Sequence, residues 1–253
     1  MTIDLKGKTG LITGGSRGIG AACAIMLAQA GMDVAITWRH DKHAARRVQQ
    51  EVERLGRRCL SLQSDVKDRR PVERTVREVV RQLGRIDLLV NNAGIWTSGA
   101  IGELSERVWD ETIAVNLKGT FLFTNTVVPV MKRQGGGRIV NISSTAGQRG
   151  EAYHSHYAAS KGAVIAFTKS IGPEIAPHGI IANCVAPGWV ETDMTAGVFK
   201  DPHGRSEIER AIPRGRAATP EEVAGTVLFL ASEFSTHLVG STISVNGGSV
   251  LSN

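Results

Sequence analysis

Short apolar runs alternate with longer amphipathic stretches along nearly the whole chain, a pattern typical of strands that alternate with helices. In residues 69–83, valines recur at helical spacing on one side, whereas residues 86–90 form an almost continuous apolar run. Such a run is typical of a parallel strand that is buried on both faces. Strands are expected at residues 9–13, 33–38, 59–63, 86–90, 138–142, 180–185 and 238–245.

Helical patterns occupy most of the segments between these strands. The clearest lie at residues 21–30, 41–55, 69–83, 105–133 and 220–232, and a further one begins near Tyr157. This alternation predicts an α/β fold, a Rossmann-like doubly wound parallel sheet of about seven strands with helices on both faces. We find no linker or repeat, so residues 1–253 are expected to form a single dinucleotide-binding catalytic domain. Residues 189–216 lack a strand pattern and predict a mobile substrate lid.

The formal net charge is +6, and the basic residues concentrate in the expected helices 41–55 and 69–83, where glutamates separate them. This pattern is usually a solvated helix face. There is no basic tail and no basic run mixed with aromatic residues, so we expect no nucleic-acid binding. A mildly positive field can still attract a phosphorylated cofactor or an acidic carrier protein.

The three cysteines, Cys23, Cys59 and Cys184, are far apart and show neither metal-ligand nor redox spacing. We therefore expect reduced, buried thiols in a cytoplasmic protein and no metal site. No signal peptide is evident, and no apolar run is long enough to span a bilayer, so contact with a membrane is not expected.

A glycine-rich turn follows the first expected strand and leads directly into a helix. A turn of this kind lets the backbone approach a pyrophosphate, whose charge the helix N-terminus stabilises. A tight turn without a ligand would also need glycine, but the flanking strand and helix favour a dinucleotide site. The candidate residues are Gly14, Ser16, Arg17, Gly18, Ile19 and Gly20.

Tyr157 and Lys161 are four residues apart in an alanine-rich helical run, so their side chains share one face of the helix. A phenol ordinarily loses its proton near pH ~10. A neighbouring ammonium lowers that pKa, and the phenol can then give or take a proton in catalysis. Taken alone, the pair could equally be two solvated surface side chains.

Several separated motifs, in one order, make the sequence similar to the short-chain dehydrogenase/reductase family from about residue 5 to residue 248. They are Asn91-Asn92-Ala93-Gly94, Asn116, Ser144, Tyr157-x-x-x-Lys161 and Pro187-Gly188. Within that family, the stretches Tyr-Ala-Ala-Ser-Lys, Ala-Pro-Gly-x-x-x-Thr-Asp-Met and Val-Asn-Gly-Gly most resemble the 3-oxoacyl-acyl-carrier-protein reductases.

The resemblance implies a role for each matching residue. It makes Tyr157 the general acid/base, Ser144 the hydrogen-bond donor to the substrate oxygen, Lys161 the partner of Tyr157, and Asn116 part of a proton path. Ser144 is chosen over Ser143 because the family's serine stands thirteen residues before the tyrosine. Cofactor contacts are implied for Asp65, Val66, Asn92, Ala93, Gly94, Tyr157, Lys161, Pro187, Gly188, Val190 and Thr192.

Substrate contacts are expected from Ser144 and Tyr157, from Trp96 and Trp189, and from the polar loop 148–156, which carries His154. His154 and His156 have the spacing of metal ligands, but no third ligand is evident. We therefore expect both imidazoles to contact solvent or substrate.

The second expected strand ends in Thr37-Trp38-Arg39-His40, with no acidic residue where one would bond the 2′-hydroxyl of NAD. Arg39 instead offers a guanidinium to a 2′-phosphate, and Arg17 is a second candidate. Asp41 comes too late in the loop to replace the missing acid. We expect NADP(H) to be preferred over NAD(H), although both arginines could simply be solvated.

The predicted reaction is NADP(H)-dependent reduction of a ketone, similar to a 3-oxoacyl thioester, to a secondary alcohol. In the family, arginines on two interface helices hold the carrier; here Arg133 could serve, but His178 stands where the second arginine is expected. A free small ketone, sugar or secondary alcohol is therefore an alternative substrate. A remote alternative function is that of a non-catalytic NADP-binding regulator. The family usually forms homotetramers. The candidate interface residues are Phe121, Phe123, Phe167 and Val245, each of which could equally belong to the core.

Overall fold

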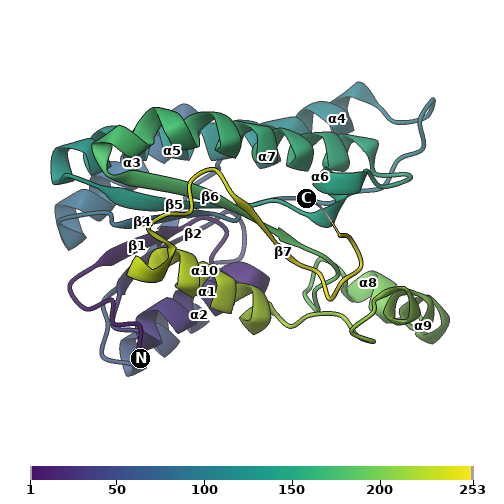
Figure 1. Cartoon of the computed structure of the whole chain (residues 1–253), viewed down its shortest axis with the longest axis horizontal. Coiled ribbons are helices and arrows are strands. Elements are labelled where there is room, and N and C mark those ends of the chain that lie inside the picture. Colours follow the sequence, from purple (N-terminus) through teal and green to yellow (C-terminus); the bar gives the residue numbers. More distant parts are fainter. Residues whose placement is uncertain (1, 252–253) are drawn as a thin grey trace.

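Seven parallel strands form one sheet at the centre of the molecule, in the order β3-β2-β1-β4-β5-β6-β7 (Figure 1). The computed structural model describes residues 2–251, so Met1, Ser252 and Asn253 of the predicted domain lie outside it. β1 and β4 are neighbours in the sheet, and the strand order runs outward from them in opposite directions. The strands are β1 (Thr9–Ile12), β2 (Asp33–Trp38), β3 (Cys59–Gln63), β4 (Leu88–Asn91), β5 (Gly137–Ile142), β6 (Ile180–Pro187) and β7 (Thr242–Val245).

Helices cover both faces of the sheet, which confirms the predicted doubly wound fold. α1 (Gly18–Gln29), α2 (Lys42–Arg54) and α10 (Pro220–Ala231) lie on one face (Figure 1). α3 (Arg69–Leu83), α5 (Gly119–Gln134) and α7 (Ser155–Ile175) lie on the other. The shorter elements are α4 (Glu106–Ile113), η1 (Ala114–Lys118), α6 (Thr145–Arg149), η2 (Ala176–His178), α8 (Ala196–Phe199), α9 (Pro202–Ala211) and η3 (Glu233–Ser235).

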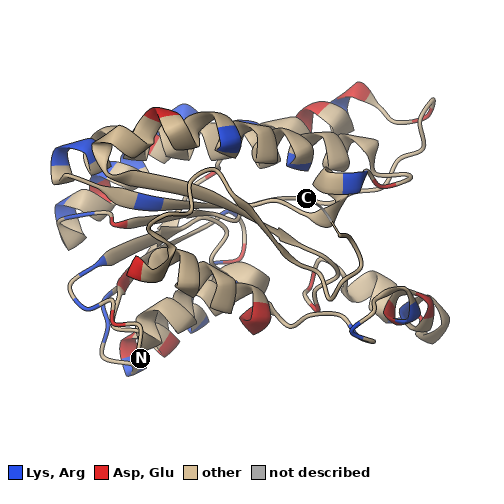
Figure 2. Ribbon diagram, in the orientation of Figure 1, with Lys and Arg blue, Asp and Glu red and all other residues tan. Residues whose placement is uncertain are grey.

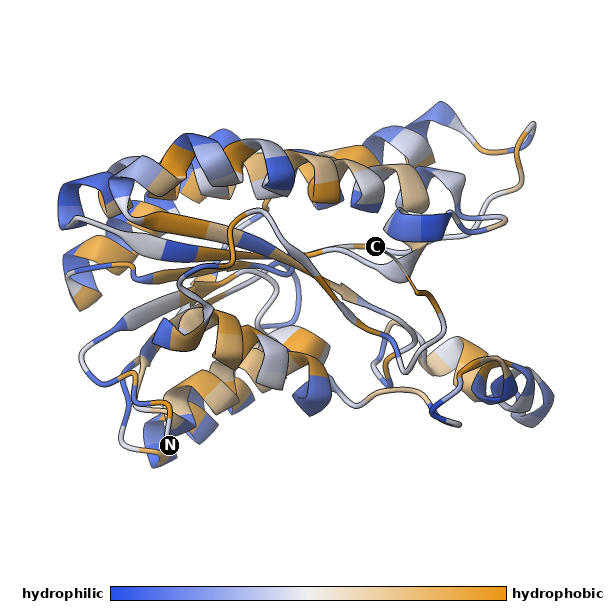
Figure 3. Ribbon diagram, viewed as in Figure 1, coloured by the Kyte–Doolittle hydropathy of each residue, from blue (hydrophilic) through white to orange (hydrophobic). Residues whose placement is uncertain are grey.

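The central strands are apolar on both sides because each side meets a helix layer, whereas the edge strands β3 and β7 are partly exposed. In β1, Leu11 and Ile12 are both 0% exposed, yet they belong to two different apolar clusters. Each cluster fills the space between one face of the sheet and the helices on that face. Figure 3 shows the corresponding apolar colour on the strands and on the inward sides of the helices. This two-sided burial explains why the strand positions could be recognised from continuous apolar runs.

The boundaries differ from the sequence predictions in three places. The helix expected at 105–133 consists of α4 and α5 joined by the π-helical segment η1, which contains Asn116. The last strand begins only at Thr242, because Leu238 first closes a turn onto Ser235. The segment 189–216 carries two short helices, α8 and α9, which lie beyond one end of the sheet (Figure 1).

Charges of both signs are interspersed along the outer helices (Figure 2), as expected for solvated helix faces. Among the described residues, no helix is both long and apolar enough to cross a membrane. Cys23, Cys59 and Cys184 are buried free thiols, as predicted, and burial raises the pKa of Cys23 and Cys59 to about 12 and that of Cys184 to about 11.

Gly147 allows α6 to lie directly against α7. A Cβ built on Gly147 would be 2.5 Å from the carbonyl carbon of Lys161 and 2.7 Å from the nitrogen of Gly162, and both are backbone atoms. We expect Gly147→Ala to lower the free energy of unfolding by about 1–3 kcal/mol because the two helices must separate. Gly225→Ala in α10 is the matched control: it has open space around its Cβ and should change stability by less than ~1 kcal/mol, in the stabilising direction. Equal urea midpoints for the two variants would contradict this account.

Candidate active site

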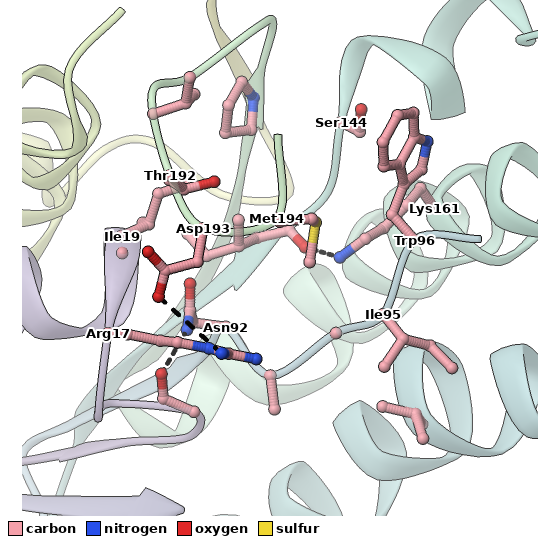
Figure 4. Close-up of a pocket in the computed structure, with 18 of the residues that line it drawn as sticks. Arg17, Ile19, Asn92, Ile95, Trp96, Ser144, Lys161, Thr192, Asp193 and Met194 are labelled. Atoms are coloured by element: carbon pink, nitrogen blue, oxygen red, sulfur yellow. Dashed lines mark hydrogen bonds and ion pairs between the residues drawn. The ribbon is translucent and has the colours of Figure 1, made fainter. Parts of the chain in front are cut away.

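One cavity of about 390 Å³ runs along the carboxyl ends of the strands, where α/β sheets bind ligands (Figure 4). It extends from the glycine turn and the end of β2 to the start of α7. Trp96, Ser144 and Trp189 line it, together with most of the predicted cofactor residues. These are Gly14, Ser16, Arg17, Gly18, Ile19, Thr37, Trp38, Arg39, Asp65, Val66, Asn92, Ala93, Gly94, Tyr157, Lys161, Pro187, Gly188, Val190 and Thr192.

The glycine turn fits a pyrophosphate. Gly14 and Gly18 have positive φ values of 64° and 53°, a conformation that favours glycine. Gly20 does not line the cavity, but a Cβ there would be 2.4 Å from the oxygen of Gly14, so any side chain would displace the turn. Arg17 is the N-cap of α1, but its side chain makes no hydrogen bond to the backbone of the first helical turn. Amides of that turn therefore remain available to an anion.

The far end of the cavity, at β2 and β3, fits an adenosine. The Trp38 indole nitrogen and the Ser64 hydroxyl are buried there without a hydrogen-bond partner. Such orphaned groups are costly unless a ligand completes them. Arg39 lies beside them, and its guanidinium pairs with Asp65 at 2.9 Å and with Glu111 at 3.2 Å.

Asn92 joins β1 to β4 under the middle of the cavity. Its amide nitrogen donates to the carbonyl oxygens of Thr13 at 3.0 Å and Gly14 at 3.1 Å. In return, the Thr13 hydroxyl accepts from the backbone nitrogens of Asn92 at 3.0 Å and Ala93 at 3.1 Å. Asn92 therefore braces the sheet at the point where β1 and β4 end.

Tyr157, Lys161 and Ser144 converge on the cavity from α7 and from the end of β5. The Lys161 ammonium is 5.9 Å from the centre of the Tyr157 ring and donates to the Ile142 carbonyl oxygen at 2.7 Å. Ser144 is the N-cap of α6, where its hydroxyl accepts from the Ala146 nitrogen at 3.1 Å. The predicted shared face of Tyr157 and Lys161 is therefore present, and it faces the cavity.

The structure differs from the predicted effect of Lys161 on Tyr157. Burial raises the pKa of Tyr157 to about 12, and only the Ser144 hydroxyl opposes this shift. Burial also lowers the pKa of Lys161 to about 8. The lysine points at a backbone carbonyl, so desolvation outweighs its charge at the phenol. As folded, Tyr157 is a protonated donor and Lys161 is the stronger acid of the two.

Asn116 is completely buried and does not line the cavity. Its oxygen accepts from the Ile95 nitrogen at 2.8 Å, and its amide donates to the Ile95 oxygen and to the Ser160 hydroxyl, both at 3.0 Å. Asn116 lies in the π-helical segment η1, where the regular α-helical pattern is interrupted. Gly94 lies between Asn116 and Lys161, since a Cβ there would be 3.3 Å from the Asn116 oxygen and 3.5 Å from the Lys161 nitrogen.

The two histidines before Tyr157 are not equivalent. His156 is 0% exposed, and its Nε2 pairs with the Thr97 hydroxyl at 2.9 Å. The prediction that His156 contacts solvent or substrate was therefore wrong; burial lowers its pKa and favours the neutral ring. His154 does not line the cavity either, but it stacks on Trp96, with the ring centres 4.5 Å apart.

The start of the predicted lid closes over the glycine turn. A Cβ on Gly18 would be 3.3 Å from the Thr192 methyl, and the Arg17 guanidinium is 3.8 Å from the Asp193 carboxylate (Figure 4). This ion pair is largely exposed, so it contributes little stability by itself. Cavity residues that the sequence did not single out are Ser64, Ile95, Val115, Ile142, Thr145, Ala146 and Thr195; Arg149 and Glu151 come from the polar loop 148–156.

Comparisons with known proteins agree with this geometry. A family model described as enoyl-(acyl carrier protein) reductase matches residues 14–250. The 3-oxoacyl-[acyl-carrier-protein] reductase FabG of Aquifex aeolicus is 40% identical over 248 residues, which cover 98% of this chain and 99% of that protein. The enzyme of the same name from Staphylococcus aureus is 39% identical over 241 residues, 95% of this chain and 97% of its own length. The crystal structure of a short-chain type dehydrogenase/reductase from Mycobacterium marinum superimposes with a TM-score of 0.93 at 35% identity, covering 99% of this chain and 98% of the other.

Proposed function

The chain belongs to the short-chain dehydrogenase/reductase family, and on that premise we propose that it interconverts a ketone and a secondary alcohol with NADP(H). The observation that carries the proposal is the meeting of Tyr157, Ser144 and Lys161 on the wall of a cavity that also contains the glycine turn. A protein that only bound a dinucleotide would need the turn but not a buried phenol beside a buried ammonium.

The chain's own residues supply the proton chemistry of the reduction. When bound, the nicotinamide provides the hydride that the carbonyl carbon receives. Tyr157 donates its proton to the carbonyl oxygen, and the Ser144 hydroxyl donates a hydrogen bond to the same atom, so the product is a neutral alcohol. Lys161 has the lower pKa and can return a proton to the tyrosine, because burial sets the two values at about 8 and about 12.

Asn116 supports this arrangement by holding two segments together. It ties Ile95, in the loop after β4, to Ser160, which directly precedes Lys161 in α7. The proposed proton path would begin at this junction. The lid, residues 189–216, would bring Val190 and Thr192 to the nicotinamide end of the cavity.

The proposed substrate is a 3-oxoacyl thioester or a related ketone, by analogy with the names of the curated relatives. A free ketone, sugar or secondary alcohol is the second candidate, because His178 replaces an expected carrier-binding arginine and two tryptophans line the cavity. The test is NADPH oxidation with an acetoacetyl thioester and with a panel of small ketones, using Tyr157→Phe as the blank. A blank-level rate with every carbonyl, and with every alcohol in the oxidative direction, would contradict the proposed reaction.

Preference for NADPH would depend on Arg39. We expect Arg39→Gln to lower kcat/KM for NADPH about tenfold and to leave kcat/KM for NADH within about threefold. Only NADPH carries a 2′-phosphate, so only NADPH loses a charge-assisted contact in the variant. Arg58→Gln is the matched control, since Arg58 pairs with Asp33 at the opposite end of β2. If the wild-type protein used NADH as well as NADPH, the proposed preference would be wrong.

We also propose a cytoplasmic homotetramer, as is usual in the family. The half-exposed ring of Phe121 on α5 is suited to an interface, whereas Phe123 is 0% exposed within one chain and belongs to the core. Phe123 is therefore not an interface residue. Sedimentation of the wild-type protein and of Phe121→Ser would test the assembly.

A further inference from the structure

Two tryptophans form a right-angled corner at the substrate end of the cavity. The rings of Trp96 and Trp189 are 5.9 Å apart with an angle of 87° between their planes. Both residues line the same cavity as Tyr157 and Ser144. In Figure 4 the Trp96 indole lies at the same end of the cavity as Ser144 and Lys161. A ligand whose carbonyl meets Tyr157 would therefore extend toward this corner.

Each indole also packs against a second aromatic ring. His154 stacks on Trp96 with only 5° between the ring planes, and Phe199 of α8 packs against Trp189 with the ring centres 5.9 Å apart. The Arg205 guanidinium in turn lies 5.5 Å from the centre of the Phe199 ring. The four rings thus form a continuous row that joins the loop after β4, the loop before α7 and the lid.

Two polar contacts fix the loops that carry Trp96 and His154. The Thr97 hydroxyl bonds to the buried His156 at 2.9 Å, and the Gly99 nitrogen donates to the Tyr153 carbonyl oxygen at 2.7 Å. Tyr153 has a positive φ of 63°, unusual for a residue other than glycine, and this contact holds it there. A platform held at several points loses little entropy when a ligand binds, so the corner is preorganised.

The other side chains at this end of the cavity indicate the charge of the ligand. Ile95 and Met194 are apolar, while Arg149 and Glu151 have opposite charges. Glu151 also lies 3.7 Å from the ring of His154. The indole and apolar walls favour a neutral substituent over a charged one, which would lose its hydration there.

We propose that this corner is a subsite for a flat, neutral aryl group, so that the preferred substrates are aryl ketones and the corresponding benzylic secondary alcohols. The inference rests on the proposed function and, of its two candidate substrates, selects the free ketone over the 3-oxoacyl thioester. A flat ring can stack on one indole while presenting its edge to the other, and such aromatic pairs add binding energy beyond the burial of area. A saturated ring of the same size fills the space but cannot make these contacts.

The test compares acetophenone with cyclohexyl methyl ketone, whose rings are of similar size. The phenyl ring also conjugates with the carbonyl and makes it less reactive, so the ratio is compared between the wild-type protein and the Trp96 variants. We expect kcat/KM for the aryl ketone to be about tenfold higher, as two aromatic contacts would give. Trp96→Leu should reduce this ratio to about one to two, whereas Trp96→Phe should keep most of it. Trp109→Leu is the control, because Trp109 lies on α4 and outside the cavity. A ratio that Trp96→Leu leaves unchanged, with both ketones reduced, would overturn the aryl subsite and leave the proposed reaction intact.

A binding measurement separates the two proposals. Calorimetric titration of the Tyr157→Phe protein with 1-phenylethanol and 1-cyclohexylethanol, in the presence of NADP⁺, requires no turnover. We expect about tenfold tighter binding of the aryl alcohol and loss of this difference in the double variant with Trp96→Leu. Tighter aryl binding without any ketone reduction by the wild-type protein would support the subsite and refute the reaction. Equal binding of the two alcohols, or tighter binding of a trimethylammonium compound of similar size, would refute the subsite.

Discussion

Replacing Tyr157 with phenylalanine is expected to lower kcat for ketone reduction by about 100- to 1000-fold, the usual effect of removing a donor aimed at developing negative charge. The substitution removes one oxygen and keeps the ring that packs in α7. The glycine turn and the adenosine end of the cavity are not touched. Affinity for NADPH, measured by fluorescence titration, should therefore stay within about threefold of the wild-type value.

The chain offers a matched control, since Tyr153 is its only other tyrosine. The Tyr153 side chain is 70% exposed, and its backbone contact to Gly99 does not need the hydroxyl, so Tyr153→Phe should retain full activity. Burial raises the pKa of Tyr157 to about 12, so ionisation of this residue should not reduce the wild-type rate of reduction below about pH 11. Turnover by Tyr157→Phe at the wild-type rate would remove the basis of the proposed mechanism.

The fold could be predicted from sequence because its central strands are buried on both faces. The resulting apolar runs are short and are separated by helices with one apolar side, so the alternation is visible without further information. Strand order was not visible in the pattern and was not predicted. The end of the chain shows the limit: Leu238 and Val239 look like strand residues, but a turn before Gly240 keeps them out of the sheet.

The candidate site was predictable where a function requires a residue type at a fixed spacing. The spacing of Tyr157 and Lys161 predicted that they share a helix face. It does not predict the hydrogen-bond acceptor of the ammonium, which in the structure is the Ile142 carbonyl oxygen. His156 looked like a polar loop residue, and its burial depends on Thr97, which lies far away in sequence. Ser64, Ile95 and Thr145 had no such signal, since only the packing of several segments brings them to the cavity.

Replacing Lys161 with methionine is expected to have two opposite effects. Turnover should fall at least about 100-fold, because the neighbour that returns the proton to Tyr157 is lost. The cofactor-free protein should nevertheless become more stable at pH 7. Lys161 is 4% exposed, and burial lowers its pKa from 10.5 to about 8, so folding must desolvate a charge. A shift of this size corresponds to about 3 kcal/mol, and loss of the hydrogen bond to Ile142 offsets about 1 kcal/mol. A gain of about 2 kcal/mol in the free energy of unfolding is expected.

The pH dependence identifies the cause of this gain. Because the folded pKa lies below the unfolded pKa, the unfolded chain binds more protons between pH 8 and pH 10.5, and wild-type stability rises across that interval relative to the variant. The advantage of Lys161→Met should thus be largest below about pH 8 and should shrink toward pH 10.5 in paired urea titrations. Lys169→Met, on the exposed side of the same helix, should change stability by less than ~0.5 kcal/mol at either pH. An advantage that is absent at pH 7, or that does not depend on pH, would mean that the ammonium is not a desolvated charge, and its assigned part in proton return would fail with it.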